Sequence, residues 1–121
     1  MSLDWKGDAI LAGVSAAFED ANDIFGRQAQ KEITDDKWPW PRGESPRDIV
    51  DTGALRNSYT PQRVSATEYE HAWTVDYALA VHEGAVGAQG ALPARPWTKA
   101  PLVELPDVFE RLVRAKLART T

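Results

Sequence analysis

The residues best suited to catalysis are Asp51, Thr52 and Gly53, which follow the apolar pair Ile49 and Val50. An Asp-Thr-Gly sequence places a carboxylate on a tight turn. If the same aspartate of a second copy lay beside it, the two carboxylates would share one proton and activate a water molecule. The motif therefore raises the hypothesis of a dimeric hydrolase that uses Asp51.

Other parts of the chain argue against hydrolysis at Asp51. The motif matches the strand and turn of retroviral-type aspartic proteases, which are all-β barrels and brace the catalytic turn with a later apolar-apolar-Gly strand. This sequence predicts two long helices instead. Because Asp-Thr-Gly also suits an ordinary turn, we expect that the chain is not an enzyme, and a dimeric aspartic protease using Asp51 is the weaker alternative.

The two histidines, His71 and His82, do not have the spacing of a metal site. Glu83 follows His82, but the second histidine of a zinc-protease helix is missing one turn later, and the chain has no cysteine. The sequence contains neither a phosphate-binding loop nor the glycine spacing of a dinucleotide site. We therefore predict no cofactor and no metal, and expect both histidines to be strand residues whose polar tips are hydrogen-bonded.

The composition is that of one folded domain. The chain has 121 residues, of which 43% are hydrophobic and 26% charged. A net charge of -4 argues against binding nucleic acid through many phosphates, and no apolar run is long enough for a membrane span. We expect a single domain over residues 1–121, no membrane partner, no direct sequence-specific nucleic-acid contact, and the cytoplasm as the default compartment.

The charges are distributed unevenly along the chain. Acidic residues outnumber basic residues in 1–36. In residues 111–121 all the charged residues are basic, namely Arg111, Arg114, Lys116 and Arg119. The two ends could attract each other or those of a neighbouring copy, or both could be solvated helix faces.

A long amphipathic helix is predicted for residues 1–33, because Leu11, Val14, Phe18, Ala21 and Phe25 recur at steps of three and four residues. Such a helix is about 45 Å long, whereas a compact domain of this size is roughly 35 Å across. Part of the helix is therefore expected to overhang the domain or to lie against a partner.

Residues 34–48 are predicted to be a loop, because Trp and Pro alternate in them. Trp38 and Trp40 of this loop either cover the core or anchor an interface.

Residues 49–83 are predicted to form a turn and antiparallel strands. One helical turn over residues 54–58 precedes strands at 59–65 and 69–75, and a third strand is predicted over 77–82. In the second strand Tyr69, His71, Trp73 and Val75 are expected to share one face, and Pro61 of the first strand is expected near a sheet edge.

Residues 84–95, rich in glycine and alanine, are predicted to be a mobile loop, and residues 96–121 a C-terminal helical region. Pro96 would open a short helical turn through Ala100, and Pro106 would lie in the first turn of the last helix. The predicted fold class is α+β, with a long N-terminal helix and a C-terminal helix packed on a small antiparallel sheet.

Three sequence blocks together resemble a known family. They are Val-Asp-Thr-Gly-Ala-Leu-Arg-Asn-Ser at 50–58, Tyr-Ala followed by Val-His-Glu-Gly within 77–84, and Pro-Ala-Arg-Pro-Trp with a later Ala within 93–100. In order and spacing they are similar to the head-tail joining, or tail-completion, proteins of long-tailed double-stranded DNA phages. Trp97 stands where phenylalanine is usual, and the N-terminal helix and the Trp/Pro segment are not distinctive of that family.

The resemblance implies a structural protein of virion assembly and no reaction. Such a protein forms a homo-oligomeric ring at the neck of a phage or prophage particle, where its partners are the connector or adaptor and the tail tube proteins. Its place would be the virion neck, and the host bacterial cytoplasm during assembly. The alternative is a small protein-binding module of unknown partner.

The blocks supply the residues that we predict to be interface or structural positions, with no catalytic residue among them. Gly53 and Gly84 are expected to provide turn backbone, and Arg56 either a local salt bridge or a subunit contact. Arg95 has the same two possible roles, and we expect its side chain to reach outward. The complete set is Asp51, Thr52, Gly53, Leu55, Arg56, His82, Glu83, Gly84, Arg95, Pro96 and Trp97. Leu55 and Trp97 are expected in the core, with Leu102 and Leu105 near the Trp97 ring.

Overall fold

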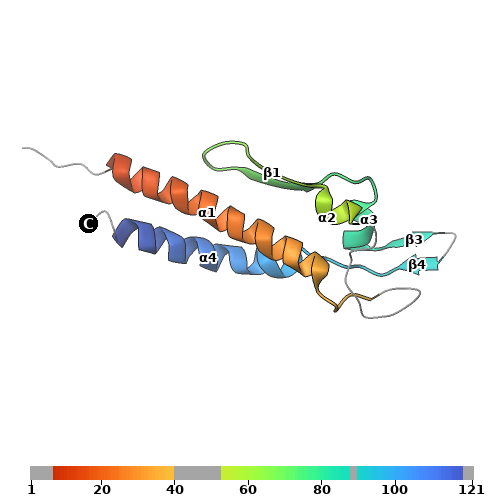
Figure 1. The fold of residues 1–121 in the computed structure, drawn as a ribbon. Helices are drawn as coiled ribbons and strands as arrows, with labels where there is room; N and C mark the ends of the chain where they lie inside the picture. Colours follow the sequence, from red (N-terminus) through yellow and green to blue (C-terminus); the bar gives the residue numbers. More distant parts are fainter. Residues whose placement is uncertain (1–6, 40–52, 88–89, 119–121) are drawn as a thin grey trace, which may run out of the picture.

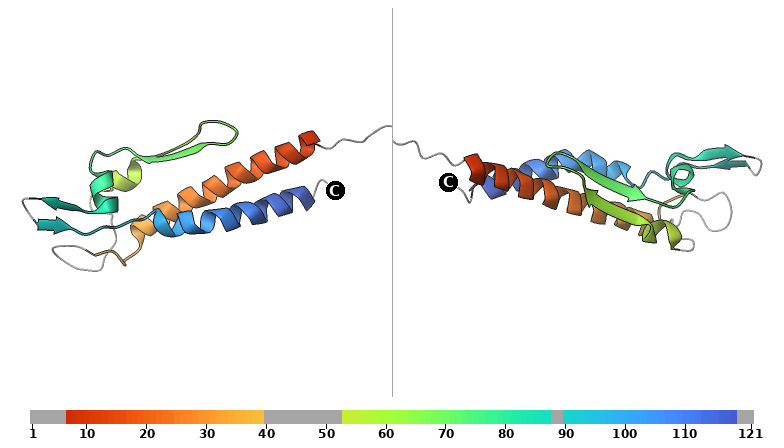
Figure 2. Two further views of the ribbon diagram at one scale, coloured as in Figure 1. Left: turned by 180° about the vertical axis from the view of Figure 1, so that it is seen from behind. Right: turned by 90° about the horizontal axis from the view of Figure 1, so that it is seen from above.

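The computed structural model describes residues 7–39, 53–87 and 90–118, which are drawn as a ribbon in Figure 1. The elements in chain order are α1 (Gly7–Thr34), α2 (Ala54–Asn57), β1 (Tyr59–Arg63), β2 (Tyr69–Trp73), α3 (Ala78–Glu83), β3 (Ala85–Gly87), β4 (Gly90–Leu92) and α4 (Lys99–Ala118). The two long helices run antiparallel side by side, and the β1–β2 hairpin lies along them (Figure 2). The predicted α+β class, with two long helices and a small antiparallel sheet, is confirmed.

One stripe of α1 is buried. Ala17, Ala21, Phe25, Ala29 and Ile33 recur every four residues and are at most 6% exposed. The alanines allow the backbone of a neighbouring helix to approach closely. The predicted long helix is therefore correct over its described part, but the apolar stripe is buried only from the middle of α1 onward, because Leu11 is 68% exposed.

The last helix, α4, is longer and more continuous than predicted. The expected division into a short turn followed by a helix that begins near Pro106 is wrong, since α4 runs without interruption from Lys99. Pro101 lies in the first turn, where a missing N–H has no cost, whereas Pro106 lies inside the helix and cannot donate to the carbonyl four residues earlier. We attribute the tolerance of this missing bond to the packing of the next turn, in which Val108 is 6% exposed.

The β1–β2 hairpin agrees with the prediction. Its strands pair antiparallel, with Tyr59 opposite Trp73 and Pro61 opposite His71. Tyr69, His71 and Trp73 are half-buried and face α1, as the alternating pattern predicted.

Two predictions for residues 77–94 are wrong. The third predicted strand is the helix α3, because Ala78, Leu79 and Ala80 favour helix and the apolar positions Ala78 and Val81 lie on one helical face. The predicted loop after it contains a second hairpin, in which β3 pairs antiparallel with β4. The mobility predicted for this segment stays a prediction.

The core lies at the C-terminal end of α1. It contains Ala29, Ile33, Trp38, Leu55, Ala78, Val81 and Trp97, with Trp73 and Val75 packed against it. Trp38 therefore covers the core, as one of the two alternatives proposed; Trp40 lies outside the described residues. In the described ranges, no helix combines the length and the apolar character that crossing a membrane requires.

Candidate functional site

The three sequence blocks meet in the core. Leu55 from the first block, Val81 from the second and Trp97 from the third are 4%, 9% and 2% exposed and belong to one buried cluster. The core positions predicted for Leu55 and Trp97 are confirmed. Asp51 and Thr52, the other motif residues of the first block, lie outside the described residues.

The first block turns on Gly53, whose φ of 83° lies in the left-handed region that favours glycine. The predicted helical turn follows as α2, and the Ser58 N–H closes it by donating to the carbonyl of Ala54 at 3.0 Å. Gln30 of α1 holds this turn in place: its Nε2 donates to the Arg56 carbonyl at 2.9 Å, and its Oε1 accepts from Trp73 Nε1 at 2.8 Å. The Arg56 side chain is exposed and makes no ion pair within the described ranges.

His82, Glu83 and Gly84 connect the second block to the third. His82 Nδ1 lies 2.6 Å from Glu83 Oε1, and its Nε2 lies 2.7 Å from Thr98 Oγ1. The imidazole also packs edge-on against the Trp97 ring, with centroids 4.8 Å apart. Gly84 ends α3 with a φ of 82°, so its predicted role as turn backbone is confirmed. All polar atoms of the His82 ring are thus used in structural contacts.

Arg95 is buried, and the prediction that it reaches outward is wrong. Arg95 is 2% exposed. Its backbone N–H donates to the Val81 carbonyl at 3.0 Å, and this bond connects the third block to α3. Burial lowers the pKa of its guanidinium from the ordinary value. The residue precedes Pro96, which favours extended backbone, and this stretch runs alongside α3 instead of into solvent. Arg95 is therefore part of the packed core region and not a free surface group.

Trp97 packs on other partners than those predicted. Its ring meets Trp73 edge-on, with centroids 5.6 Å apart, in addition to His82. Leu102 is 56% exposed, and neither Leu102 nor Leu105 belongs to the buried cluster. Pro96 is half-buried beside Trp97, and its carbonyl accepts the Lys99 N–H at 3.1 Å where α4 begins.

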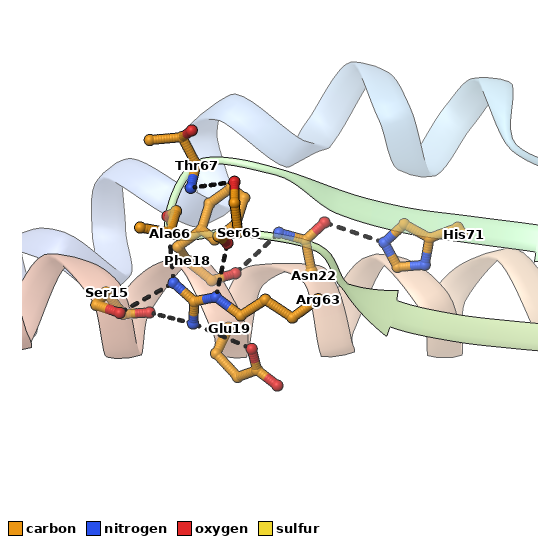
Figure 3. A network of polar contacts seen from close by, with 9 residues as sticks. All are labelled: Ser15, Phe18, Glu19, Asn22, Arg63, Ser65, Ala66, Thr67 and His71. Carbon is orange, nitrogen blue, oxygen red and sulfur yellow. Dashed lines mark hydrogen bonds and ion pairs between the residues drawn. The ribbon is translucent and has the colours of Figure 1, made fainter.

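A second cluster of polar contacts, which the sequence did not indicate, attaches the β1–β2 hairpin to α1 (Figure 3). Arg63 Nη1 donates to Glu19 Oε2 and to the Ser15 carbonyl, both at 3.1 Å, and Nη2 donates to Ser15 Oγ at 2.9 Å. The same guanidinium donates to the carbonyls of Ser65 and Ala66 at the hairpin turn, at 3.2 Å each. Because one cation binds both elements, Arg63 fixes the position of the hairpin tip on the helix.

A chain of hydrogen bonds crosses from the hairpin to α1 through His71. Tyr59 Oη lies 2.7 Å from His71 Nδ1, and burial raises the pKa of Tyr59 to about 12. Because the Asn22 amide oxygen can only accept, the neutral His71 ring carries its proton on Nε2, and its Nδ1 accepts from the Tyr59 hydroxyl. His71 Nε2 then donates to Asn22 Oδ1 at 3.0 Å, and Asn22 Nδ2 donates to the Phe18 carbonyl at 2.9 Å. Burial lowers the pKa of His71, an effect that Asp23 partly opposes, so the neutral ring that this chain requires is favoured.

Gly26 makes room for Tyr59 in this chain of hydrogen bonds. A Cβ atom at residue 26 would lie 2.0 Å from Tyr59 Oη and 2.9 Å from its Cζ. Any larger residue would displace the phenol from His71.

The two edges of the β1–β2 hairpin face grooves of different character. Along β1 lies a groove lined by three exposed cations, Arg27, Lys31 and Arg56, together with Tyr59, Pro61 and one exposed acid, Asp23. We call it the basic groove.

Along β2 lies a mainly apolar groove between the hairpin and both long helices. It is lined by Phe18, Tyr69, Leu105 and Phe109, with Glu68 and Glu70 at its rim. The hairpin thus separates a basic surface from an apolar surface with an acidic rim.

The polar contacts of Arg63, His71 and His82 connect helices and strands of the fold. The described residues contain no group of three or more His, Asp or Glu side chains placed to hold a metal ion. Comparison of the chain with protein-family models, with curated proteins and with solved structures finds no match.

Proposed function

We propose that this chain is a structural virion assembly protein that forms a ring at the head-tail junction of a phage or prophage. The observation that carries the proposal is the meeting of the three blocks in one core through Leu55, Val81 and Trp97. Segments that belong to one family motif are expected to pack together, and these do, although they lie far apart in the sequence. The motif residues with described side chains make structural contacts or lie on the surface, which suits a protein that assembles and does not catalyse.

The uncovered apolar surface supports assembly with other chains. Leu11 is 68% exposed, and Leu102 and Val103 are 56% and 71% exposed. Single exposed apolar residues are ordinary, but neighbouring pairs on long helices suit faces that a second copy covers. The partners under this proposal are other copies of the chain, the connector or adaptor, and the tail tube proteins, and its location is the virion neck.

Disruption of the gene in the phage or prophage that encodes this chain tests the proposal. We expect DNA-filled heads and separate tails that do not join, and we expect the protein supplied in trans to restore joined particles. Joined particles in the absence of the protein would refute the proposal.

The same complementation assay separates the proposal from its alternatives. The Asp51→Asn chain is the matched control, because the proposal assigns no role to the Asp51 carboxylate. Loss of joining with the Asp51→Asn chain, together with a peptide cleavage at acidic pH that needs Asp51, would favour the aspartic protease. Normal particles combined with capture of an unrelated host protein would favour a small binding module.

A further inference from the structure

The basic groove is lined by three cations and one acid, Asp23. Arg27 and Lys31 are one turn apart on α1, and Arg56 faces them from α2. Within the described ranges none of the three forms an ion pair, whereas Arg63, Arg114 and Lys116 each pair with an acid. In a chain with a net charge of -4, a groove that carries three cations against one acid, with no ion pair to any of the three cations among the described residues, favours an acidic partner.

The exposed face of α4 carries acids with the matching arrangement, beside Arg111 and the ion pair of Glu110 with Arg114. Glu104 and Asp107 are exposed and one turn apart, and neither carboxylate forms an ion pair within the part of the chain that the structure describes. Residues three or four apart on a helix have neighbouring side chains, so this pair has nearly the spacing of Arg27 and Lys31. Val103, which is 71% exposed, lies beside Glu104 and would add an apolar contact. We call Val103, Glu104 and Asp107 the acidic stripe.

The basic groove of a chain does not contain its own acidic stripe. The groove is lined by residues of α1, α2 and β1, and the stripe lies on α4. A contact between two different surfaces of identical chains is head-to-tail, and such contacts close into rings when the rotation allows.

Backbone pairing along β1 does not compete with this contact. Pro61 lies at the middle of that strand and has no N–H to offer, which makes the β1 edge a poor template for a further strand. Side-chain charges are therefore the specific feature of this edge.

We propose that the basic groove of one copy binds the acidic stripe of α4 of the next copy, and that Arg27 and Lys31 pair with Glu104 and Asp107 across this contact. Pro61 and the Tyr59 ring would receive Val103. This inference rests on the proposed ring and identifies the surfaces that form it.

Charge reversal on each surface tests the pairing on the full-length chain. Arg27→Glu with Lys31→Glu, and separately Glu104→Lys with Asp107→Lys, are each expected to weaken self-association by about tenfold or more, because like charges then face each other. Mixing the two variants restores attraction between unlike copies at both types of contact, so the mixture is expected to recover association that neither variant shows alone. Sedimentation velocity measures the assembly, and melting temperature checks that each variant is folded.

A matched control uses Glu68→Lys with Glu70→Lys, which changes the net charge by the same amount at the rim of the other groove. This control is expected to assemble normally. If a reversed chain melts early, the neutral pair Arg27→Gln and Lys31→Gln replaces it, with a smaller expected weakening.

The outcomes distinguish this inference from the proposed function. If the original chain forms a ring but the reversed chains assemble equally well, or their mixture is not rescued, the pairing is wrong and the neck function stands. If the original chain does not associate at concentrations up to about 1 mM, the pairing is wrong as well, because weaker contacts do not specify a ring. If association is lost only in the Glu68 and Glu70 control, the acidic partner is the rim of the apolar groove and not α4.

Discussion

The two ends of the α1–α4 pair differ in how completely they are covered. At the end where the three blocks meet, Ile33 is 0% and Trp97 2% exposed, and several elements contribute to one cluster. At the other end, where the first turns of α1 lie beside the last turns of α4 (Figure 1), Ile10 is 40% and Leu11 68% exposed. We call them the block end and the free end. The first end contains the buried core, whereas the second offers apolar surface to another chain in addition to the basic groove and the acidic stripe.

The β1–β2 hairpin extends from the block end toward the free end. Its attachment near the block end is aromatic, with Trp73 against Trp97, whereas its tip is fixed by the polar contacts of Arg63 with Ser15 and Glu19. If the two ends differ in this way, substitutions in the buried cluster should lower stability, substitution of His71 should change its pH dependence, and substitutions at the free end should weaken association without loss of stability.

Replacement of Trp97 by alanine is expected to have the largest effect on stability. The ring is almost completely buried against Trp73 and His82. Its loss should lower the free energy of unfolding by about 3–5 kcal/mol. Urea unfolding of the purified chain measures this change, and a loss below about 1 kcal/mol would mean that the block end is not the core of the fold.

Replacement of Arg95 by alanine is expected to have the next largest effect, at least about 2 kcal/mol, because a long buried side chain and its contacts are lost. The conservative change Arg95→Lys should recover only part of this loss, since lysine lacks the planar guanidinium. If the melting temperature of Arg95→Ala lies within a few degrees of that of the original chain, Arg95 is not a buried part of the core region, and the original prediction of a surface position would be right.

His71 should make the stability depend on pH. Burial, opposed in part by Asp23, lowers its pKa below the ordinary 6.5, so the unfolded chain binds the proton more readily than the folded chain does. The contribution of the neutral ring is fully present above about pH 6.5 and is lost as the pH falls through the lowered folded pKa.

Thermal unfolding between about pH 7.5 and about pH 5, a range that contains the ordinary histidine pKa, measures this effect. His71→Gln keeps an acceptor and a donor but does not titrate, so its melting temperature should fall less over the same range. Equal falls in both chains would show that carboxylates, and not His71, account for the acid sensitivity.

Replacement of Leu11 by serine is expected to have the smallest effect on stability, within about 0.5 kcal/mol, because the side chain is exposed. The same change should weaken association if the free end is covered by another chain. Phe25→Ser, on the buried stripe of the same helix, is the control that should lower the melting temperature instead. A Leu11→Ser chain that keeps both its stability and its association would show that the free end has no partner.

Local patterns predicted the elements with a single strong signal. The period of α1, the alternation in β2 and the turn chemistry at Gly53 each led to the observed element. The short helix α3 was missed because an apolar run of six residues suits a strand as well as a helix, and only the contacts of Ala78 and Val81 with the core decide between them.

Such local patterns could not predict the tertiary contacts of single polar residues. Arg63 and His71 bind partners on α1 that are distant in sequence, and no spacing rule connects them. Arg95 was expected to reach outward because it precedes the helical turn predicted at Pro96, and its burial follows from the path of residues 93–97 alongside α3. For the candidate site, the three blocks could be recognised in the sequence. The sequence did not indicate that Arg27, Lys31 and Arg56 would line one groove beside β1.

Ring formation is tested most simply by the absolute mass of the purified chain, measured by light scattering over a concentration series. A ring-forming neck protein should converge, as concentration rises, on one mass that is a fixed multiple of the chain mass and then stop growing, because a closed ring has no unoccupied contact surface. A chain that remains a monomer, or stops at a dimer, up to about 1 mM would contradict the assignment to the neck ring.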